Sequence, residues 1–189
     1  MPLVLGLTGL AGSGKGAVAD YLDREYDFER YTFSHVLREE AEKRDLLKGL
    51  SYEQRKQVLS KLGEELRRET GRWDIVAEKT IEKMRLDRFE NAVVDGFRST
   101  EEVKLFKENF QRYYLVAVET AEEVRFARRK ARDPTVTLEA FRKRDEENIK
   151  IMGLGNVMKM ADYKIFNSEQ GLGNLYRKVD GILEDINFK

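Results

Sequence analysis

The sequence predicts an α/β fold, in which helices cover both faces of a five-stranded parallel sheet. Short apolar runs alternate along the chain with longer segments whose apolar residues recur at helical spacing, and this order is typical of a doubly wound sheet. The run at 113–118 shows no polar alternation, as expected of a strand that is covered on both sides. The chain has 189 residues and no linker rich in Pro and Gly, so we expect a single domain over 1–189.

Five segments are expected to be strands. The run at 3–7 is continuously apolar, and 27–33 alternates polar with aromatic residues. A third buried run, 92–94, ends in the acidic Asp95. The last two expected strands are 113–118 and 163–166.

Helices are expected to fill a long insertion at about 34–88, between the second and third strands. Ser34 is a candidate N-cap for a helix over 35–43. A second helix opens at Ser51 and is ended by Gly71, and a third follows over 73–84. So long an excursion predicts that this segment covers one side of a binding site.

More helices are expected after the third and fourth strands. They start at Thr100, at Thr120 and at Thr137, and the last of them runs to about Met152. Residues 132–135, Arg-Asp-Pro-Thr, interrupt the two later helices. The remaining expected elements are a loop at 153–155 and a closing helix at 172–183.

The composition excludes several classes of function. Lys plus Arg and Asp plus Glu number 35 each, and this neutral balance argues against a nucleic-acid-binding protein. The absence of Cys excludes disulfides and thiol chemistry, and a single His argues against a His-built metal centre. No segment reaches the roughly 18 apolar residues of a membrane span. We therefore expect a cytoplasmic protein, monomeric or homodimeric, without a membrane partner.

A glycine-rich segment, 9–16, lies between the first strand and the first helix and reads Gly-Leu-Ala-Gly-Ser-Gly-Lys-Gly. Its glycines allow successive backbone N–H groups to converge on one phosphate, to which the helix N-terminus adds its dipole. Lys15 supplies a cation for the β- and γ-phosphates. The segment predicts a phosphate-binding loop, and hence the three-layer sandwich of P-loop nucleotide-binding proteins. Its nucleotide-binding residues are expected to be Gly9, Leu10, Ala11, Gly12, Ser13, Gly14, Lys15, Gly16 and Ala17.

Two residues of this segment depart from the general pattern. A Ser or Thr usually follows the Lys, and its hydroxyl binds Mg²⁺, whereas here Gly16 and Ala17 follow. This departure disfavours a generic ATPase or GTPase and leaves the mode of metal binding open. Asp95 ends the third strand at the edge where ligands bind in such folds, so we expect it to hold Mg²⁺ through water. The alternative is that Asp95 caps a turn.

Arginines follow two of the expected strands. Arg98 lies three residues beyond Asp95, where a guanidinium can grip a phosphate with two hydrogen bonds. Arg38 lies one turn into the helix after the second strand. It is a candidate ligand for the phosphate of an acceptor, or alternatively a partner of Glu42 at i+4.

Four more arginines share one helical face within a predicted lid at about 125–145. Like charges at i and i+4 repel each other, so this face needs compensation, which phosphates under a lid would provide. The alternative is a surface face paired with Glu122, Asp133 or a neighbouring helix. Arg142 and Arg144, beyond the interruption, are candidates for the other half of the lid. The four arginines are Arg125, Arg128, Arg129 and Arg132.

Several of these motifs resemble known kinases. Segments 9–16, 37–38 and 94–99 resemble motifs of the nucleoside monophosphate kinases, adenylate kinase above all, whereas 161–167 resembles a segment of dephospho-coenzyme A kinase. Over nearly its whole length the chain is similar to an archaeal, adenylate-kinase-related family of nucleotide kinases. The motifs that carry this similarity are 37–40, 95–99, 143–145 and 153–162.

The resemblance implies a kinase that moves the γ-phosphoryl group of ATP-Mg to a small nucleotide acceptor, with AMP as the leading candidate. Alternatives are dephospho-coenzyme A kinase and a nucleotide-binding regulator with little turnover. The similarity to dephospho-coenzyme A kinase also places Asn167 near the adenine of ATP. The expected acceptor-binding residues are Ser34, Arg38, Gly96, Arg98 and Arg144, and the expected catalytic residues are Lys15, Arg98, Arg129 and Arg132.

Overall fold

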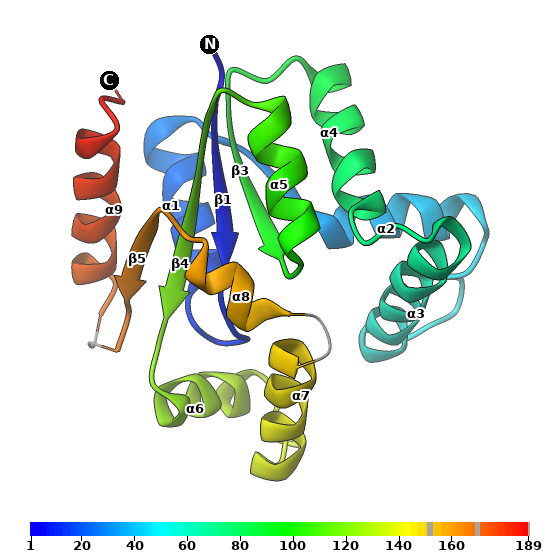
Figure 1. Ribbon diagram of the computed structural model, residues 1–189. Helices are drawn as coiled ribbons and strands as arrows, with labels where there is room; N and C mark the ends of the chain where they lie inside the picture. The colour runs from blue at the N-terminus through cyan, green and yellow to red at the C-terminus, as the bar shows by residue number, and fades with distance from the viewer. Residues whose placement is uncertain (151–152, 169–170, 189) are drawn as a thin grey trace.

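A computed structural model of the protein describes residues 1–150, 153–168 and 171–188. Its sheet has five parallel strands in the order β2-β3-β1-β4-β5, as Figure 1 shows. The expected α/β three-layer fold is therefore confirmed. The strands are β1 (Leu3–Thr8), β2 (Glu29–Thr32), β3 (Asn91–Phe97), β4 (Arg112–Glu119) and β5 (Tyr163–Phe166).

Two helices, α1 (Lys15–Tyr26) and α9 (Gly173–Asp185), cover one face of the sheet. Alternate residues of each strand point to this face, because successive side chains of a strand lie on opposite sides. Burying each large aliphatic side chain here contributes about 1.5–3 kcal/mol. The strand residues of this core include Leu3, Leu5, Leu7, Val93, Val116 and Val118.

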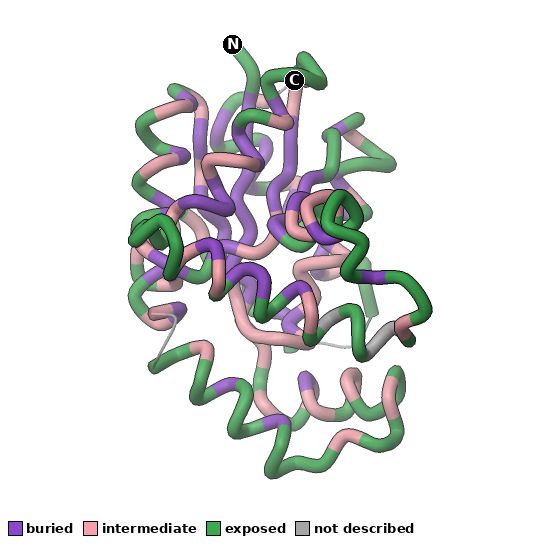
Figure 2. The backbone as a smooth tube through the Cα atoms, turned by 90° about the vertical axis from the view of Figure 1, so that its right-hand side faces the viewer, coloured by how far each residue is buried: buried purple, intermediate pink, exposed green. Residues whose placement is uncertain are grey.

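The other face carries the helices of the insertion together with two later helices. Val4, Val94 and Leu115 point to this side and form the core with them. Figure 2 shows that buried residues concentrate where the sheet and these helices pack. The helices are α2 (Phe33–Lys43), α3 (Tyr52–Thr70), α4 (Ile75–Asp87), α5 (Thr100–Asn109) and α8 (Leu154–Lys159).

Two helices, α6 (Glu122–Arg132) and α7 (Leu138–Lys150), lie beyond the carboxyl ends of the strands (Figure 1). Most of their residues are exposed or half-buried (Figure 2). They follow β4 and precede β5, so the chain leaves the sheet at its binding edge and returns to it.

Several expected element boundaries are wrong, each for a local reason. Thr32, not Ser34, caps α2, because the strand runs directly into the helix and Thr32 Oγ1 accepts a hydrogen bond of 3.0 Å from His35 N. The strand expected at 27–33 is shortened to β2, because Asp27 adopts a left-handed conformation beyond α1.

Two later expectations also need correction. Thr120 does not cap α6, because its hydroxyl donates instead to Ser13 O and Asn167 O, at 2.8 and 3.1 Å. Residues 153–155 are not a loop: after Gly153, with φ +77°, the chain forms α8, whose Leu154 enters the core. The expected end of the preceding helix, Met152, lies outside the described residues.

Candidate functional site

The glycine-rich segment forms a tight turn between β1 and α1. Gly9, Gly12 and Gly14 have φ values of +138°, +83° and +108°, a region that disfavours residues with a Cβ. A Cβ on Gly14 would also lie 2.3 Å from Asn167 Nδ2. Gly14 is the N-cap residue of α1 and offers no side-chain hydrogen bond to the first turn. The N-terminus of α1 is thus arranged to receive an anion.

Lys15 folds back over this turn. Its Nζ donates to Gly9 O at 2.8 Å and to Leu10 O at 3.3 Å. Burial lowers the pKa of Lys15. The charge of Asp95 raises this pKa, and the charges of Arg98 and Arg144 lower it further. The Lys15 ammonium is therefore buried beside Asp95, which has the largest charge effect on its pKa, and near arginines whose repulsion phosphate groups would relieve.

Asp95 is placed beside the phosphate loop by an irregularity in the sheet. Leu7 of β1 pairs with Asp95, but Thr8 pairs with Phe97, so that Gly96 is skipped. Gly96 has φ +126°, and Thr8 Oγ1 donates to Phe97 O at 3.0 Å. A Gly at this position lets the strand bulge and turn away from β1.

The carboxylate of Asp95 has an oxygen, Oδ1, that is buried without a hydrogen-bond partner in the described part of the chain. Burial raises the pKa of Asp95, and the charges of Lys15, Arg30 and Arg98 lower it. A carboxylate that caps a turn would accept a hydrogen bond, so this orphaned oxygen argues against the turn-capping alternative. It points instead to a ligand that the protein does not supply.

The donor set fits Mg²⁺ that arrives with a nucleotide. Within the described residues there is no group of three or more His, Asp or Glu side chains that could hold a metal by themselves. Mg²⁺ commonly uses one or two carboxylates, water and substrate phosphates. Asp95 offers that single carboxylate, and Gly16 offers no hydroxyl. Bound Mg²⁺ would neutralise charge on the phosphates.

Arg98 is anchored through its backbone at the start of α5. Glu102 Oε2 accepts from Arg98 N at 2.8 Å and from Ser99 N at 3.1 Å, in a capping box with Ser99. Its other oxygen, Oε1, accepts from Arg67 of α3 at 3.2 Å. Glu102 is fully buried, whereas the residue Arg98 is exposed. The fold therefore fixes the backbone of Arg98 at the start of α5.

The acceptor-binding candidates on α2 lie at the end of the sheet beside β3. Thr32 of β2 pairs with Asp95, so α2 begins next to that carboxylate. Ser34 and Arg38 are both exposed, and their i, i+4 spacing puts them on one face of α2. In the described structure Arg38 forms no ion pair with Glu42. Roles for Ser34, Arg38 and Gly96 in acceptor binding stay predictions.

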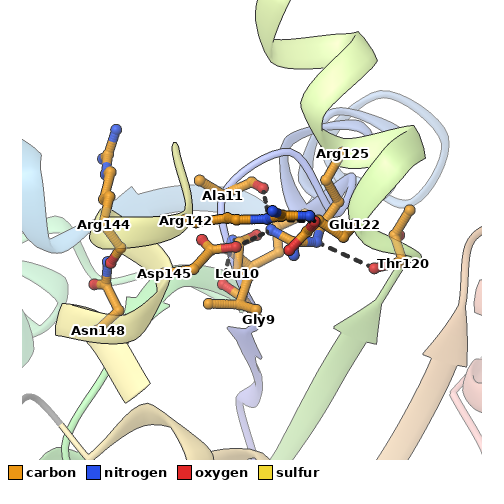
Figure 3. Close-up of polar contacts among 11 residues, drawn as sticks. Gly9, Leu10, Ala11, Thr120, Glu122, Arg125, Arg142, Arg144, Asp145 and Asn148 are labelled. Carbon is orange, nitrogen blue, oxygen red and sulfur yellow. Dashed lines mark hydrogen bonds and ion pairs between the residues drawn. The ribbon is translucent and has the colours of Figure 1, made fainter. Parts of the chain in front are cut away.

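Arg125 differs from the expected lid arginine, since it is buried. Its Nη1 contacts Asp145 Oδ2 at 2.6 Å and Ala11 O at 3.3 Å, and its Nε donates to Thr120 O at 3.1 Å. Figure 3 shows these groups gathered between α6, α7 and the phosphate loop. The alternative of pairing with a neighbouring helix therefore holds for Arg125, and it corrects the view of one uniform phosphate-facing stripe.

The other arginines of this face have separate environments. Arg128 donates to the loop carbonyls of Gly12 and Ser13, at 3.3 and 3.4 Å, and to Asn167 O at 3.3 Å. Arg129 lies 3.6 Å from Asp133. Arg132 is exposed, as is Arg144, which extends away from the Arg125 cluster in Figure 3. Catalytic roles for Arg129 and Arg132, and acceptor binding by Arg144, stay predictions.

Asn167 supports the phosphate loop from β5. Its Nδ2 donates to Ser13 O at 2.8 Å, and the residue is buried. Asp162, in the segment that resembles dephospho-coenzyme A kinase, also has structural contacts: its Oδ2 accepts from Leu115 N at 2.8 Å. Its Oδ1 pairs with Lys107 at 3.3 Å.

The sequence pattern assigned no role in the site to Arg30, to Thr120, which it predicted only as a helix start, or to the partner of Arg125. Arg30 belongs to a polar edge strand, which gives no motif. Asp145 does lie in the motif at 143–145, and this was the only signal available for it. The contacts of all three residues join different elements of the fold, which a local pattern does not report.

Comparison with known proteins places the chain in a family. Residues 8–151 match the family model described as "AAA domain". A UPF0200 protein from Thermococcus onnurineus is 36% identical over 172 residues, which cover 87% of this chain and 88% of the relative. The chain belongs to the UPF0200 family and carries an AAA domain.

Solved structures place this UPF0200 member among P-loop kinase-like folds. TT1252 from Thermus thermophilus matches with a TM-score of 0.64 at 19% identity, over 97% of both chains. Shikimate kinase from Acinetobacter baumannii, in complex with shikimate, matches with a TM-score of 0.60 at 17% identity, over 100% of this chain and 97% of the other. Across the described residues no helix combines the length and apolarity needed to cross a membrane.

Proposed function

We propose that the protein is an ATP-dependent phosphotransferase that moves the γ-phosphoryl group of ATP-Mg to a nucleoside monophosphate such as AMP. The observation that carries this proposal is the meeting of Lys15, at the start of α1, with Asp95 and Arg98, at the end of β3. Asp95 and Arg98 lie close enough to Lys15 to shift its pKa in opposite directions. Phosphoryl transfer requires alignment and charge neutralisation rather than covalent chemistry from the protein, and these groups supply both.

The loop at 9–17 is proposed to bind the phosphates of ATP. Lys15 then leaves its carbonyl partners for the β- and γ-phosphates, and Asp95 holds Mg²⁺ and its waters. Asn167 donates a hydrogen bond to Ser13 O. We therefore propose that it stabilises the loop that binds ATP, in addition to lying near the adenine. The loop lies at the N-terminus of α1, where the helix dipole and free backbone N–H groups favour binding of the phosphates.

The insertion at about 34–88 is proposed to bind the acceptor. Arg98 and Arg38 would hold its phosphate, with Ser34 and Gly96 beside them. The lid at about 125–145 is proposed to close over the site, with Arg129, Arg132 and Arg144 neutralising charge that develops during transfer. We also propose a cytoplasmic monomer or homodimer without a nucleic-acid partner, in keeping with the neutral charge balance.

A nucleotide-binding regulator is the second candidate. Gly16 leaves the loop without the usual metal-binding hydroxyl, and Asp95 is the carboxylate that faces the loop. Weak metal binding would slow transfer without preventing ATP binding. The two functions differ in turnover, so they are separable by a direct assay.

An acceptor screen tests the proposal. Production of ADP from ATP and Mg²⁺ is measured with AMP, CMP, GMP, UMP, their deoxy forms and dephospho-coenzyme A, and with shikimate and gluconate because the fold is shared with kinases of small metabolites. We expect ADP with a nucleoside monophosphate and little without an acceptor. Equal ADP production without any acceptor would contradict the acceptor roles of Arg38 and Arg98. Tight ATP binding without ADP would favour the regulator.

The variant Lys15→Met tests whether the phosphate loop is needed for transfer. It removes the cation without a large change in side-chain volume, and we expect transfer to fall at least about 100-fold. Lys104→Met, at an exposed position on α5, is the control and should retain the full rate. A Lys15→Met protein with wild-type rates would refute the assignment of the loop.

A further inference from the structure

The missing hydroxyl at residue 16 leaves an open position beside the phosphate loop. Gly16 has an ordinary helical backbone conformation, so a side chain is not excluded there. An ideal Cβ built on Gly16 would meet one atom within 4 Å outside its own helix in the described structure, Arg30 Nη2, at 3.8 Å. The position that a Ser hydroxyl would take in related loops is therefore faced by a guanidinium.

The register of the sheet places Arg30 on the metal side of the site. Arg30 pairs with Val93 and Thr32 with Asp95, and paired residues of parallel strands point to the same face. Val93 packs into the core beneath α1 and α9. Arg30 and Asp95 consequently share the face that α1 covers, where Gly16 begins the helix. The charge of Arg30 also lowers the pKa of Asp95, in keeping with their proximity.

Asp20 of α1 orients the Arg30 side chain. Arg30 Nη1 donates to Asp20 Oδ1, and Asp20 lies one turn after Gly16, on the same helix face. This pair directs the other terminal nitrogen, Nη2, toward Gly16. Both side chains are partly solvated, with 35% and 62% of their surface exposed, and ion pairs this exposed contribute little to stability. Stability alone is thus a weak reason for this arrangement.

We propose that Arg30 binds the triphosphate of the nucleotide from the side of Gly16. There it supplies part of the positive charge that a metal held by a Ser or Thr hydroxyl supplies in other phosphate loops. This inference rests on the proposed nucleotide site. A guanidinium offers fixed hydrogen-bond donors that match phosphate oxygens. Binding of ATP in this protein consequently depends less on Mg²⁺ than binding in a loop with the hydroxyl.

The test measures the Kd for ATP by isothermal titration calorimetry, once with Mg²⁺ and once with EDTA. The variants are Arg30→Met, Gly16→Ser and the double variant. Arg30→Met should weaken binding in EDTA at least about tenfold, as expected for loss of a hydrogen bond to a charged group. Gly16→Ser should enlarge the effect of Mg²⁺ and restore part of the affinity of Arg30→Met when Mg²⁺ is present. Unchanged affinity of Arg30→Met in EDTA would overturn the proposal.

Two controls separate the possible causes. Arg24→Met removes another arginine of α1, one that pairs with its neighbour Glu25, and should leave ATP affinity unchanged. Asp20→Asn removes the negative charge but keeps an oxygen that can accept from Arg30 Nη1 and orient it, so this variant should retain most of the affinity. An equal loss in Asp20→Asn and Arg30→Met would mean that the pair merely supports the fold, which would overturn the proposal.

Lys15→Met distinguishes failure of this inference from failure of the proposed function. If Lys15→Met loses ATP binding and Arg30→Met does not, the nucleotide site stands and the role of Arg30 is wrong. If Lys15→Met binds ATP like the wild type, the nucleotide site itself is wrong. Arg30→Lys, which keeps the charge but loses the fork of donors, should bind ATP with intermediate affinity in EDTA.

Discussion

Arg125 of α6 and Asp145 of α7 form a buried ion pair, with 2.6 Å between Nη1 and Oδ2. The same guanidinium reaches Ala11 O in the phosphate loop and lies over the ring of Phe141, 5.1 Å from its centroid. One side chain thereby joins both helices beyond the sheet to the loop that is proposed to bind ATP (Figure 3).

Breaking this pair should destabilise the protein. Arg125→Met leaves the Asp145 carboxylate buried without its partner, and we expect the free energy of unfolding to fall by about 3–5 kcal/mol. The double variant Arg125→Met/Asp145→Leu should lose less than the sum of the single variants, because neither charge is left behind. Urea unfolding measures both effects. Strictly additive losses would contradict the pairing, and Arg142→Met, whose partner Glu122 is at the surface, should change stability little.

Glu102 should control the acceptor side of the site through Arg98. Glu102→Gln keeps one acceptor oxygen and replaces the other with an N–H₂ group. This group then faces donors, either Arg98 N and Ser99 N or the Arg67 guanidinium. We expect KM for the acceptor to rise about tenfold, since the backbone of Arg98 is no longer fixed, with KM for ATP nearly unchanged. Steady-state kinetics with each substrate varied in turn would show this split. Glu101→Gln, one residue away and exposed, is the control; equal effects of the two variants would refute the idea.

Substitution by Ala should weaken ATP binding at Gly14 but not at Gly16. Gly14→Ala places a Cβ 2.3 Å from Asn167 Nδ2 at a φ of +108°, a strain of about 1–3 kcal/mol that the loop relieves by moving. ATP binding should therefore be lost or strongly weakened. Gly16→Ala meets only the flexible end of Arg30 at 3.8 Å and should bind ATP nearly as the wild type does. Calorimetry checks both variants, and comparable losses would contradict the geometry.

Asp95→Asn should separate metal use from nucleotide binding. Without its carboxylate the site holds Mg²⁺ less well, so the Mg²⁺ concentration for half-maximal transfer should rise, with kcat falling about 100-fold. In EDTA the variant should bind ATP at least as tightly as the wild type, because a negative charge near the phosphates is gone. Asp23→Asn, an exposed control on α1, should change neither quantity. Weaker ATP binding in EDTA would contradict a metal-directed role for Asp95.

Most of the fold was predictable from local sequence. The runs at 3–7, 113–118 and 163–166 correspond to β1, β4 and β5, since apolar runs and helical spacing report burial directly. The wrong boundaries lie where a polar side chain had two possible partners. Thr120 has the chemistry of an N-cap, but tertiary packing gives its hydroxyl the carbonyls of Ser13 and Asn167 instead. A local sequence pattern cannot show whether the Thr120 hydroxyl caps the next helix or donates to Ser13, which lies 107 residues away.

The sequence by itself determined the phosphate loop, because the spacing of its glycines and Lys15 between a strand and a helix is a local property of the chain. It likewise indicated Asp95 and Arg98, since both follow one buried strand. Only the tertiary structure decided that Arg125 is paired inside the protein and that Arg30 faces Gly16. The first outcome depends on the packing of α7 against α6, and the second on the register of β2 against β3. The charge of an arginine is visible in the sequence, but its partner is selected by the packing of one element against another, which local patterns do not encode.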